Sequence, residues 1–130
     1  MDQQTMRQHG AFSWNELMTT DVPAAKAFYG QLFDWDMQDE KTCDMSYTMA
    51  RAGQQEVAGI MAMPPEAGGA PPAWGAYVTV DDVDQRSTQV EKLGGKIIIP
   101  ARDIPNVGRF VVIADPQGAV LALITYTHIG

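Results

Sequence analysis

The chain has 130 residues, of which 45% are apolar, and its formal net charge is −7. This length and apolar content fit one folded domain with its own core and exclude a disordered chain. Nucleic acid is excluded as a partner, because the acidic balance repels phosphates and no stripe of Lys or Arg offsets that repulsion.

Cysteine content and apolar patterning bear on the cellular compartment. Cys43 is the only cysteine, which excludes a disulfide framework and a thiolate zinc site and suits a reducing compartment. The first nine residues carry no apolar signal core, and no apolar run approaches the roughly 18 residues that a membrane span needs. We therefore expect a cytoplasmic protein without a membrane partner.

The first predicted strand covers residues 11–20, where side chains alternate with period two. One face of this strand carries Phe12, Trp14, Glu16 and Met18. A carboxylate flanked by large apolar side chains is unusual on a core strand. Glu16 is therefore the first candidate for a functional group.

A helix is expected to follow and to run to about Phe33. Asp21 is its predicted N-cap, and Pro23 lies in its first turn, where the missing N–H costs nothing. The predicted buried stripe of this helix has helical spacing and consists of Ala25, Phe28 and Leu32.

Extended segments complete the first unit, at residues 34–38, 45–51 and 56–63. A hairpin turn is expected around Gly53. The acidic run from Asp34 to Asp44 is interpreted as a solvated turn, because it lacks the spacing of a calcium-binding loop. Residues 64–72 hold four prolines and two glycines, so this segment is predicted to be a linker, either a surface connection or a flap over a pocket.

The second unit repeats the order of the first. Asp81 or Asp82 is expected to cap a helix that ends at Gly94-Gly95, and the buried positions of this helix are predicted to be Val83, Val90 and Leu93. The expected strands cover 74–80, 96–100, 109–114 and 119–126. The last two strands are joined by Asp115-Pro116-Gln117-Gly118, which has the preferred residues of a type I turn.

Matched positions support an internal repeat: Trp14 with Trp74, Thr19 with Thr79, and Asp21 with Asp81. Both units have the order β-α-β-β-β, and such a repeat in a short chain predicts two similar units that share one core. The fold class is therefore α+β. We expect one domain over residues 1–130, with units at 11–63 and 73–127 and the linker at 64–72.

Several strings resemble the vicinal oxygen chelate superfamily, which includes glyoxalase I, the bleomycin-resistance proteins and the extradiol dioxygenases. Asp21-Val-Pro-Ala-Ala-Lys-Ala-Phe-Tyr29 is similar to the first helix of that family, and Asp115-Pro116-Gln117-Gly118 to its last hairpin. Trp14-Asn-Glu-Leu and Gly108-Arg-Phe resemble a subgroup of glyoxalase-like proteins related to a mycobacterial secreted-antigen family. The resemblance covers about residues 11–126 and implies a curved eight-stranded mixed sheet around a cleft.

Metal-dependent members of that superfamily bind one divalent ion through His, Gln or Glu side chains on equivalent strands of both units. The resemblance places those positions at Trp14, at Trp74 or Gly75, at Ala122, and near Gly59 or Ile60. None of these side chains offers a lone pair to a metal ion. We therefore predict no metal site and no cofactor.

Glu16 is the predicted catalytic residue. It would act as a general base or a hydrogen-bond acceptor with a pKa raised by apolar neighbours, and the alternative is a structural carboxylate paired with Arg or water. Trp14 and Trp74 are expected on the cleft face. They would form either an aromatic clamp for a flat or apolar ligand or packing that fills the place of the metal.

Further candidates for ligand binding are Tyr47, Arg109 and Tyr126. The tyrosines offer hydroxyls to the cleft or complete its packing, and Arg109 binds a carboxylate, pairs with Glu16 or serves as surface charge. His9 and His128 could meet across a dimer, and exposed terminal histidines are the simpler interpretation. Cys43 has no nearby base and receives no catalytic role.

Three functions are compatible with these residues. The first is binding of a small aromatic or apolar molecule without a metal, with Glu16 orienting the molecule or acting as acid and base. The second is a divalent-metal-dependent lyase, isomerase or dioxygenase, and the third is a non-catalytic interaction module. We expect a homodimer, because a small domain gains stability by association.

Overall fold

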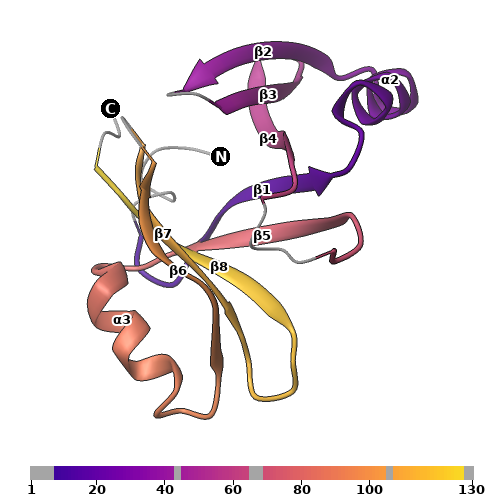
Figure 1. Ribbon diagram of the computed structural model, residues 1–130. Helices are drawn as coiled ribbons and strands as arrows, with labels where there is room; N and C mark the ends of the chain where they lie inside the picture. Colours follow the sequence, from indigo (N-terminus) through magenta and orange to yellow (C-terminus); the bar gives the residue numbers. More distant parts are fainter. Residues whose placement is uncertain (1–7, 43–44, 65–68, 105–106, 128–130) are drawn as a thin grey trace. The chain divides into compact units, whose positions relative to one another are not determined.

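The computed structural model describes residues 8–42, 45–64, 69–104 and 107–127. Its elements in chain order are β1 (Phe12–Thr19), α2 (Val22–Phe33), β2 (Asp36–Thr42), β3 (Met45–Ala52), β4 (Gln55–Ala62), β5 (Ala73–Thr79), α3 (Val83–Val90), β6 (Lys96–Ile104), β7 (Gly108–Ala114) and β8 (Val120–Tyr126). The order β-α-β-β-β therefore occurs twice, and the prediction of an α+β fold is confirmed (Figure 1).

The strands form one mixed sheet with the order β2-β3-β4-β1-β5-β8-β7-β6. Within the described residues, the chain divides into two compact units. The first unit holds residues 15–75, and the second holds residues 8–14 and 76–127. Strands β1 and β5 each contribute residues to both units, so the division falls inside these strands rather than in the predicted linker.

In the first unit, β2 pairs antiparallel with β3, β3 pairs antiparallel with β4, and β4 pairs parallel with β1. The hairpin between β3 and β4 turns at Gly53, whose φ of 64° lies in the left-handed region that favours glycine. The acidic run is not the turn that we predicted. Asp36, Asp39 and Glu40 lie in β2, where exposed charges are tolerated because β2 is the last strand in the order of the sheet.

In the second unit, β5 pairs parallel with β8, and β8, β7 and β6 are antiparallel neighbours. The predicted turn before β8 is confirmed, since the Asp115 carboxylate accepts hydrogen bonds from the N–H groups of Gln117 at 3.0 Å and Ala119 at 2.9 Å. Strand β6 runs past Pro100, where we expected it to stop. Proline is accommodated there because β6 is an outer strand of the sheet and shifts register beside it.

Helix α3 buries one side against β6, β7 and β8 (Figure 1). Val83 and Val90 are 2% and 8% exposed, and Val83 joins the apolar cluster of Val80, Val111 and Leu123. Asp82 is the N-cap and accepts from the N–H of Gln85 at 3.1 Å, which decides between the two predicted caps. The prediction for Leu93 is wrong: it is 76% exposed, because the helix ends at Val90.

Helix α2 behaves differently. Its predicted cap is confirmed, since Asp21 accepts from the N–H of Ala24 at 3.0 Å, and its predicted end at Phe33 is also confirmed. The predicted buried stripe is wrong, because Phe28 is 61% exposed, Leu32 is 58% exposed, and no residue of the helix is buried.

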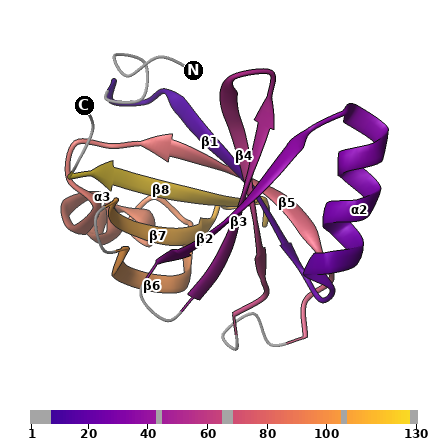
Figure 2. The same cartoon turned by 90° about the horizontal axis from the view of Figure 1, so that it is seen from above.

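The reason lies in how α2 is rotated about its axis. The half-buried positions lie on the side towards β4 and β2, and they are Val22, Ala25, Lys26, Tyr29 and Gly30. Within the first unit, this leaves α2 against strands on one side only (Figure 2). The helix therefore leaves its leucine and both of its phenylalanines exposed on the other side.

Candidate functional site

Glu16 lies in the middle of β1 and is 6% exposed, so a carboxylate is buried on a strand of the first unit. Its register partner on the neighbouring strand β4 is Gly59. An isolated buried carboxylate costs several kcal/mol unless hydrogen bonds compensate for the lost water. The burial of Glu16 therefore requires specific partners around it.

Tyr47 on β3 supplies one such partner, because its hydroxyl donates a hydrogen bond of 2.9 Å to Oε2 of Glu16. Met49 pairs with Gly59 across β3 and β4, and Gly59 pairs with Glu16 across β4 and β1. Tyr47 therefore reaches over β4 to meet a side chain two strands away. Strands β1 and β3 carry the two side chains, and β4 lies between these strands.

Gly59 makes the contact between Tyr47 and Glu16 sterically feasible. A Cβ atom at position 59 would overlap the hydroxyl and the ring carbons of Tyr47. The residue is buried, and its φ is not in the left-handed region, so close approach of the tyrosine is what requires glycine here. The sequence signal was present as a glycine inside an apolar strand, and we did not connect it with Tyr47.

Chemically, the arrangement is a carboxylate that accepts from a phenol in a place with little water. Hydrogen bonds to ionised groups are roughly twice as strong as neutral ones, so the pair holds the Glu16 carboxylate in one orientation. A carboxylate fixed in this way can accept a hydrogen bond or a proton from a bound molecule. The predicted residues Glu16 and Tyr47 are thus brought together.

Trp14 and Tyr126 belong to the second unit. Trp14 packs against the buried cluster formed by Tyr77, Ile99, Val112, Ala122 and Ile124, and Tyr126 lies at the edge of the same cluster. The hydroxyls of Ser13 and Tyr126 share a hydrogen bond of 2.9 Å. Both predicted residues therefore have structural partners within their own unit, and their role in ligand binding stays a prediction.

Trp74 belongs to the first unit, so its predicted pairing with Trp14 in a common cleft stays a prediction. It is 41% exposed, and its indole N–H donates to the hydroxyl of Tyr29 at 3.1 Å. The ring of Tyr29 lies 5.3 Å from that of Trp74 and contacts Phe33 and Trp35. We missed this aromatic cluster, although Phe28, Tyr29, Phe33 and Trp35 stand close together in the sequence.

Arg109 is engaged by two carboxylates of the second unit. Its Nε atom donates to both oxygens of Asp84, at 3.1 and 3.0 Å, and its Nη1 atom donates to Asp103 at 3.1 Å. Asp84 and, secondarily, Asp103 raise the pKa of the guanidinium. A ligand carboxylate would have to compete with these partners, and the predicted role of Arg109 stays a prediction.

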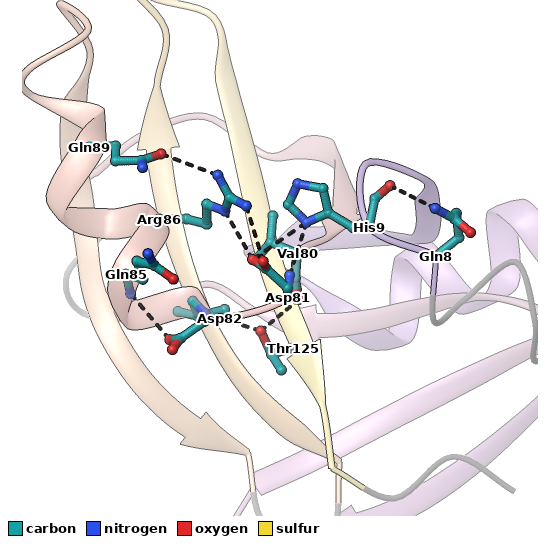
Figure 3. A network of polar contacts seen from close by, with 10 residues as sticks. Gln8, His9, Val80, Asp81, Asp82, Gln85, Arg86, Gln89 and Thr125 are labelled. Carbon is teal, nitrogen blue, oxygen red and sulfur yellow. Dashed lines mark hydrogen bonds and ion pairs between the residues drawn. The ribbon is translucent and has the colours of Figure 1, made fainter.

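His9 is held near the start of α3 (Figure 3). Its Nδ1 atom accepts a hydrogen bond of 3.0 Å from the N–H of Asp81, whose carboxylate in turn accepts from Nε and Nη2 of Arg86 at 2.9 and 3.0 Å. The hydrogen bond from Arg86 lowers the pKa of Asp81. The network ties residues 8–10 to the second unit. His128 and Cys43, which we also discussed, lie outside the described residues.

The positions that the resemblance assigns to metal ligands do not fit a metal. Ala122 is buried in an apolar cluster on which Trp14 packs, and the space beside Gly59 is taken by the hydroxyl of Tyr47. Among the described residues, no three His, Cys, Asp or Glu side chains group closely enough to hold an ion. The donor chemistry of these positions is therefore unsuited to a divalent cation.

Comparison with known proteins identifies relatives of the chain. Residues 11–123 match the model of the Glyoxalase/Bleomycin resistance protein/Dioxygenase superfamily. CFP32 of Mycobacterium tuberculosis, which carries the name "Putative glyoxylase", is 40% identical over 126 residues, which are 95% of this chain and 48% of CFP32. The anthracycline biosynthesis protein DnrV of Streptomyces peucetius is 32% identical over 88% of this chain and 46% of DnrV. The chain thus spans about half the length of both relatives.

A solved structure supports the same fold. Methylmalonyl-CoA epimerase from Mycobacterium tuberculosis aligns over 90% of both chains with a TM-score of 0.61 and 14% identity. The predicted resemblance and its mycobacterial subgroup are confirmed by the family model and by the identity with CFP32. Within the described residues, neither helix is long and apolar enough to cross a membrane.

Proposed function

The chain belongs to the Glyoxalase/Bleomycin resistance protein/Dioxygenase superfamily, and we propose that it binds a small aromatic or apolar molecule at the Glu16–Tyr47 pair without using a metal. Glu16 would accept a hydrogen bond from the molecule, and Tyr47 would keep the carboxylate in place. The same pair would support acid–base chemistry if the bound molecule carries an acidic proton.

The observation that carries this proposal is the buried carboxylate of Glu16 beneath the Tyr47 hydroxyl, with Gly59 leaving room for their contact. A strand that needed only stability would place an apolar side chain at position 16, since burial of a charge rarely improves stability. Buried carboxylates with a fixed hydrogen-bond partner are typical of functional sites. This inference concerns only residues of the first unit.

The names of the relatives suggest the class of ligand. DnrV is named for anthracycline biosynthesis. Anthracyclines contain a flat anthraquinone ring system that carries hydroxyl groups. A ligand of this kind offers hydroxyl donors to a carboxylate and a flat apolar surface to aromatic side chains. The alternative ligand class is a small oxo compound, as the glyoxylase name of CFP32 suggests.

The test is a titration of the protein with an anthracycline and with anthraquinone-2-carboxylate, followed by tryptophan fluorescence and by the shift in melting temperature. Glu16→Gln should weaken binding by about 10- to 100-fold, because a hydrogen bond to a charged group contributes about 1.5–3 kcal/mol. The matched control is Glu91→Gln, which changes an exposed carboxylate after α3. Equal affinities of the wild type and Glu16→Gln would contradict the proposal.

Two further variants separate the chemistry of the pair from its packing. Tyr47→Phe removes only the hydroxyl, whereas Gly59→Ala adds a methyl group that overlaps the Tyr47 side chain. We expect Gly59→Ala to weaken binding at least as much as Tyr47→Phe, because it displaces the whole ring. Normal binding by Gly59→Ala would show that the position of Tyr47 does not matter.

A second candidate is a metal-dependent lyase, isomerase or dioxygenase, and the buried oxygen donor of Glu16 is the observation that favours it. Elemental analysis of the purified protein after exposure to Mn²⁺, Ni²⁺, Zn²⁺ and Fe²⁺ distinguishes the two. One metal ion per chain that is lost in Glu16→Gln would replace the metal-free proposal with this candidate. Trace metal in both proteins would leave the Glu16–Tyr47 pair as the working site.

A further inference from the structure

An open groove lies beside the N-terminal half of α2, within the first unit. Its volume is about 340 Å³, and its walls come from the end of β1, the first two turns of α2, Pro72 and the start of β5. Pockets that bind small molecules have volumes of roughly 300–1,000 Å³, so a small organic molecule fits this groove. The side chains in the walls determine which class of molecule it is.

The groove is separate from the Glu16–Tyr47 pair. Strand β1 contributes Leu17 and Thr19 to the walls of the groove. Successive side chains of a strand point to opposite faces of the sheet, so these two residues face away from the side on which Glu16 meets Tyr47. What the groove binds therefore does not depend on the ligand proposed for that pair.

Three aromatic side chains line the groove, and they are Phe28, Tyr29 and Trp74. The ring of Tyr29 lies nearly perpendicular to the other two, at interplanar angles of 87° to Phe28 and 79° to Trp74. The hydrogen bond from the indole N–H to the Tyr29 hydroxyl holds Trp74 in place. Phe28 and Trp74 are 61% and 41% exposed, so much of their ring surface is open to a bound molecule.

Asp21 adds a negative charge to this aromatic wall. Its exposed carboxylate lines the groove, and Oδ1 accepts the hydrogen bond from the N–H of Ala24 that caps α2. The helix N-terminus contributes about half a positive charge, which the full negative charge of the carboxylate exceeds. Within the described residues, Asp21 forms no ion pair, and Lys26, the one charged residue of α2, is engaged by Asp39 at 2.7 Å. The groove is therefore acidic as well as aromatic.

We propose that this groove binds a small organic cation, namely an ammonium ion that carries apolar substituents. The faces of aromatic rings attract a cation through the ring quadrupole, and Asp21 supplies the opposite charge. The formal net charge of −7 raises the concentration of cations around the whole protein. An anion would be repelled by Asp21, and a neutral molecule would gain nothing from the carboxylate.

The walls of the groove favour an organic cation over a metal ion. Calcium and magnesium ions need several oxygen ligands, whereas this groove offers one carboxylate among mainly apolar and aromatic side chains. Apolar substituents on a nitrogen, by contrast, can pack against Phe28 and Trp74 while the charge lies near Asp21. Because the carboxylate is exposed to water, its attraction is modest, and we expect dissociation constants in the high micromolar to millimolar range.

An NMR titration of the full chain with benzyltrimethylammonium tests the proposal, and benzyl alcohol and benzoate serve as comparisons with the same ring and a different charge. The cation should cause saturable shifts of the amide signals of residues 21–29 and 73–75. We expect it to bind at least about 5-fold more tightly than benzyl alcohol, and benzoate to bind most weakly. Shifts centred on Glu16, Tyr47 and Gly59 instead would overturn the assignment of the cation to the groove.

Two substitutions test the charge and the ring separately. Asp21→Asn should weaken binding of the cation by about 2- to 5-fold, and it keeps a side-chain oxygen for the helix cap, since Asn caps as well as Asp. The matched control is Asp82→Asn, which removes the same charge from the N-cap of α3 in the second unit and should bind like the wild type. Phe28→Leu replaces an exposed ring and should weaken binding of the cation by about 2- to 5-fold.

Thermal melting establishes that the variants fold. If Asp21→Asn does not fold, the salt dependence of the wild type replaces it, because added sodium chloride should weaken binding of the cation and leave that of benzyl alcohol unchanged. Equal affinities for the cation and the alcohol, or equal effects of Asp21→Asn and Asp82→Asn, would overturn recognition of charge. The absence of saturable shifts in the groove would overturn the proposal as a whole.

Discussion

Helices α2 and α3 occupy equivalent places in the two repeats, yet the more apolar helix, α2, is the more exposed of the two. Helix α3 is mostly polar and buries its two valines against three strands. Helix α2 is rich in Ala and Phe and buries no residue. An apolar helix face thus predicts a packing contact, and it does not predict whether that contact is made within the same unit or with another molecule.

The largest expected difference between the helices concerns their contribution to stability. Val83→Ala should lower the free energy of unfolding by about 2 kcal/mol, since it removes two buried methyl groups and leaves a cavity. Phe28→Ala removes a larger but exposed side chain and should cost less than about 1 kcal/mol at low protein concentration. Urea denaturation measures both values.

Concentration provides the control for this comparison. The cost of Val83→Ala should not depend on protein concentration, and a cost of Phe28→Ala that grows with concentration would show that association covers α2. Equal costs for the two substitutions at low concentration would mean that α2 is buried in solution as firmly as α3.

The local structure of the chain was largely predictable because short-range signals specify it. Asp21 and Asp115 each stand a few residues before the backbone N–H group that their carboxylate binds. Gly53 adopts the left-handed backbone conformation that its turn needs. The rotation of α2 was not predictable. Ala25 and Phe28 both have the spacing of a core position, and the choice between a Phe28 side and a Tyr29 side depends on contacts with distant strands.

The candidate site was predictable in part for a similar reason. Glu16 was recognisable because alternation along one strand placed a carboxylate among apolar side chains. Its partnership with Tyr47 depends on the register of three strands, and the need for Gly59 depends on a contact across that register. Register is set when strands pair in the assembled sheet, so it cannot be inferred from the sequence of one strand alone.

The caps offer a second and smaller comparison of the two helices. Asp82→Ala should lower global stability by about 1 kcal/mol, because α3 is part of the core of its unit and must remain formed. Asp21→Ala removes the equivalent hydrogen bond from α2, which is only half-buried, so part of the loss should appear as local fraying. Faster amide exchange at residues 24–27, with a smaller change in global stability, is the expected result.

Amide exchange and urea denaturation on the same two variants provide the check. A global loss for Asp21→Ala that matches the loss for Asp82→Ala would indicate that α2 cannot open without the rest of the protein. Such a result would contradict the expectation that the half-buried helix α2 frays locally.

The smallest expected difference concerns the ion pairs beside the two helices. The hydrogen bond from Arg86 holds the pKa of Asp81 below its ordinary value of 3.8, and the hydrogen bond from Lys26, with a second from Thr48, does the same for Asp39. A carboxyl whose pKa is lower in the folded state stabilises that state when ionised. The contribution is complete above pH 3.8 and is lost as the pH falls through the lowered folded value.

Asp81→Asn and Asp39→Asn should therefore reduce the melting temperature slightly at pH 6, and this difference should shrink as the pH falls through the lowered folded pKa of each carboxyl. Both pairs are exposed, so added salt should shrink the difference at pH 6. Asp81 also accepts from two nitrogens of Arg86, whereas Asp39 receives a single lysine nitrogen, so the Asp81 effect should be the larger. A larger effect of Asp39→Asn would show that α2 is held to β2 more firmly than its exposed face suggests.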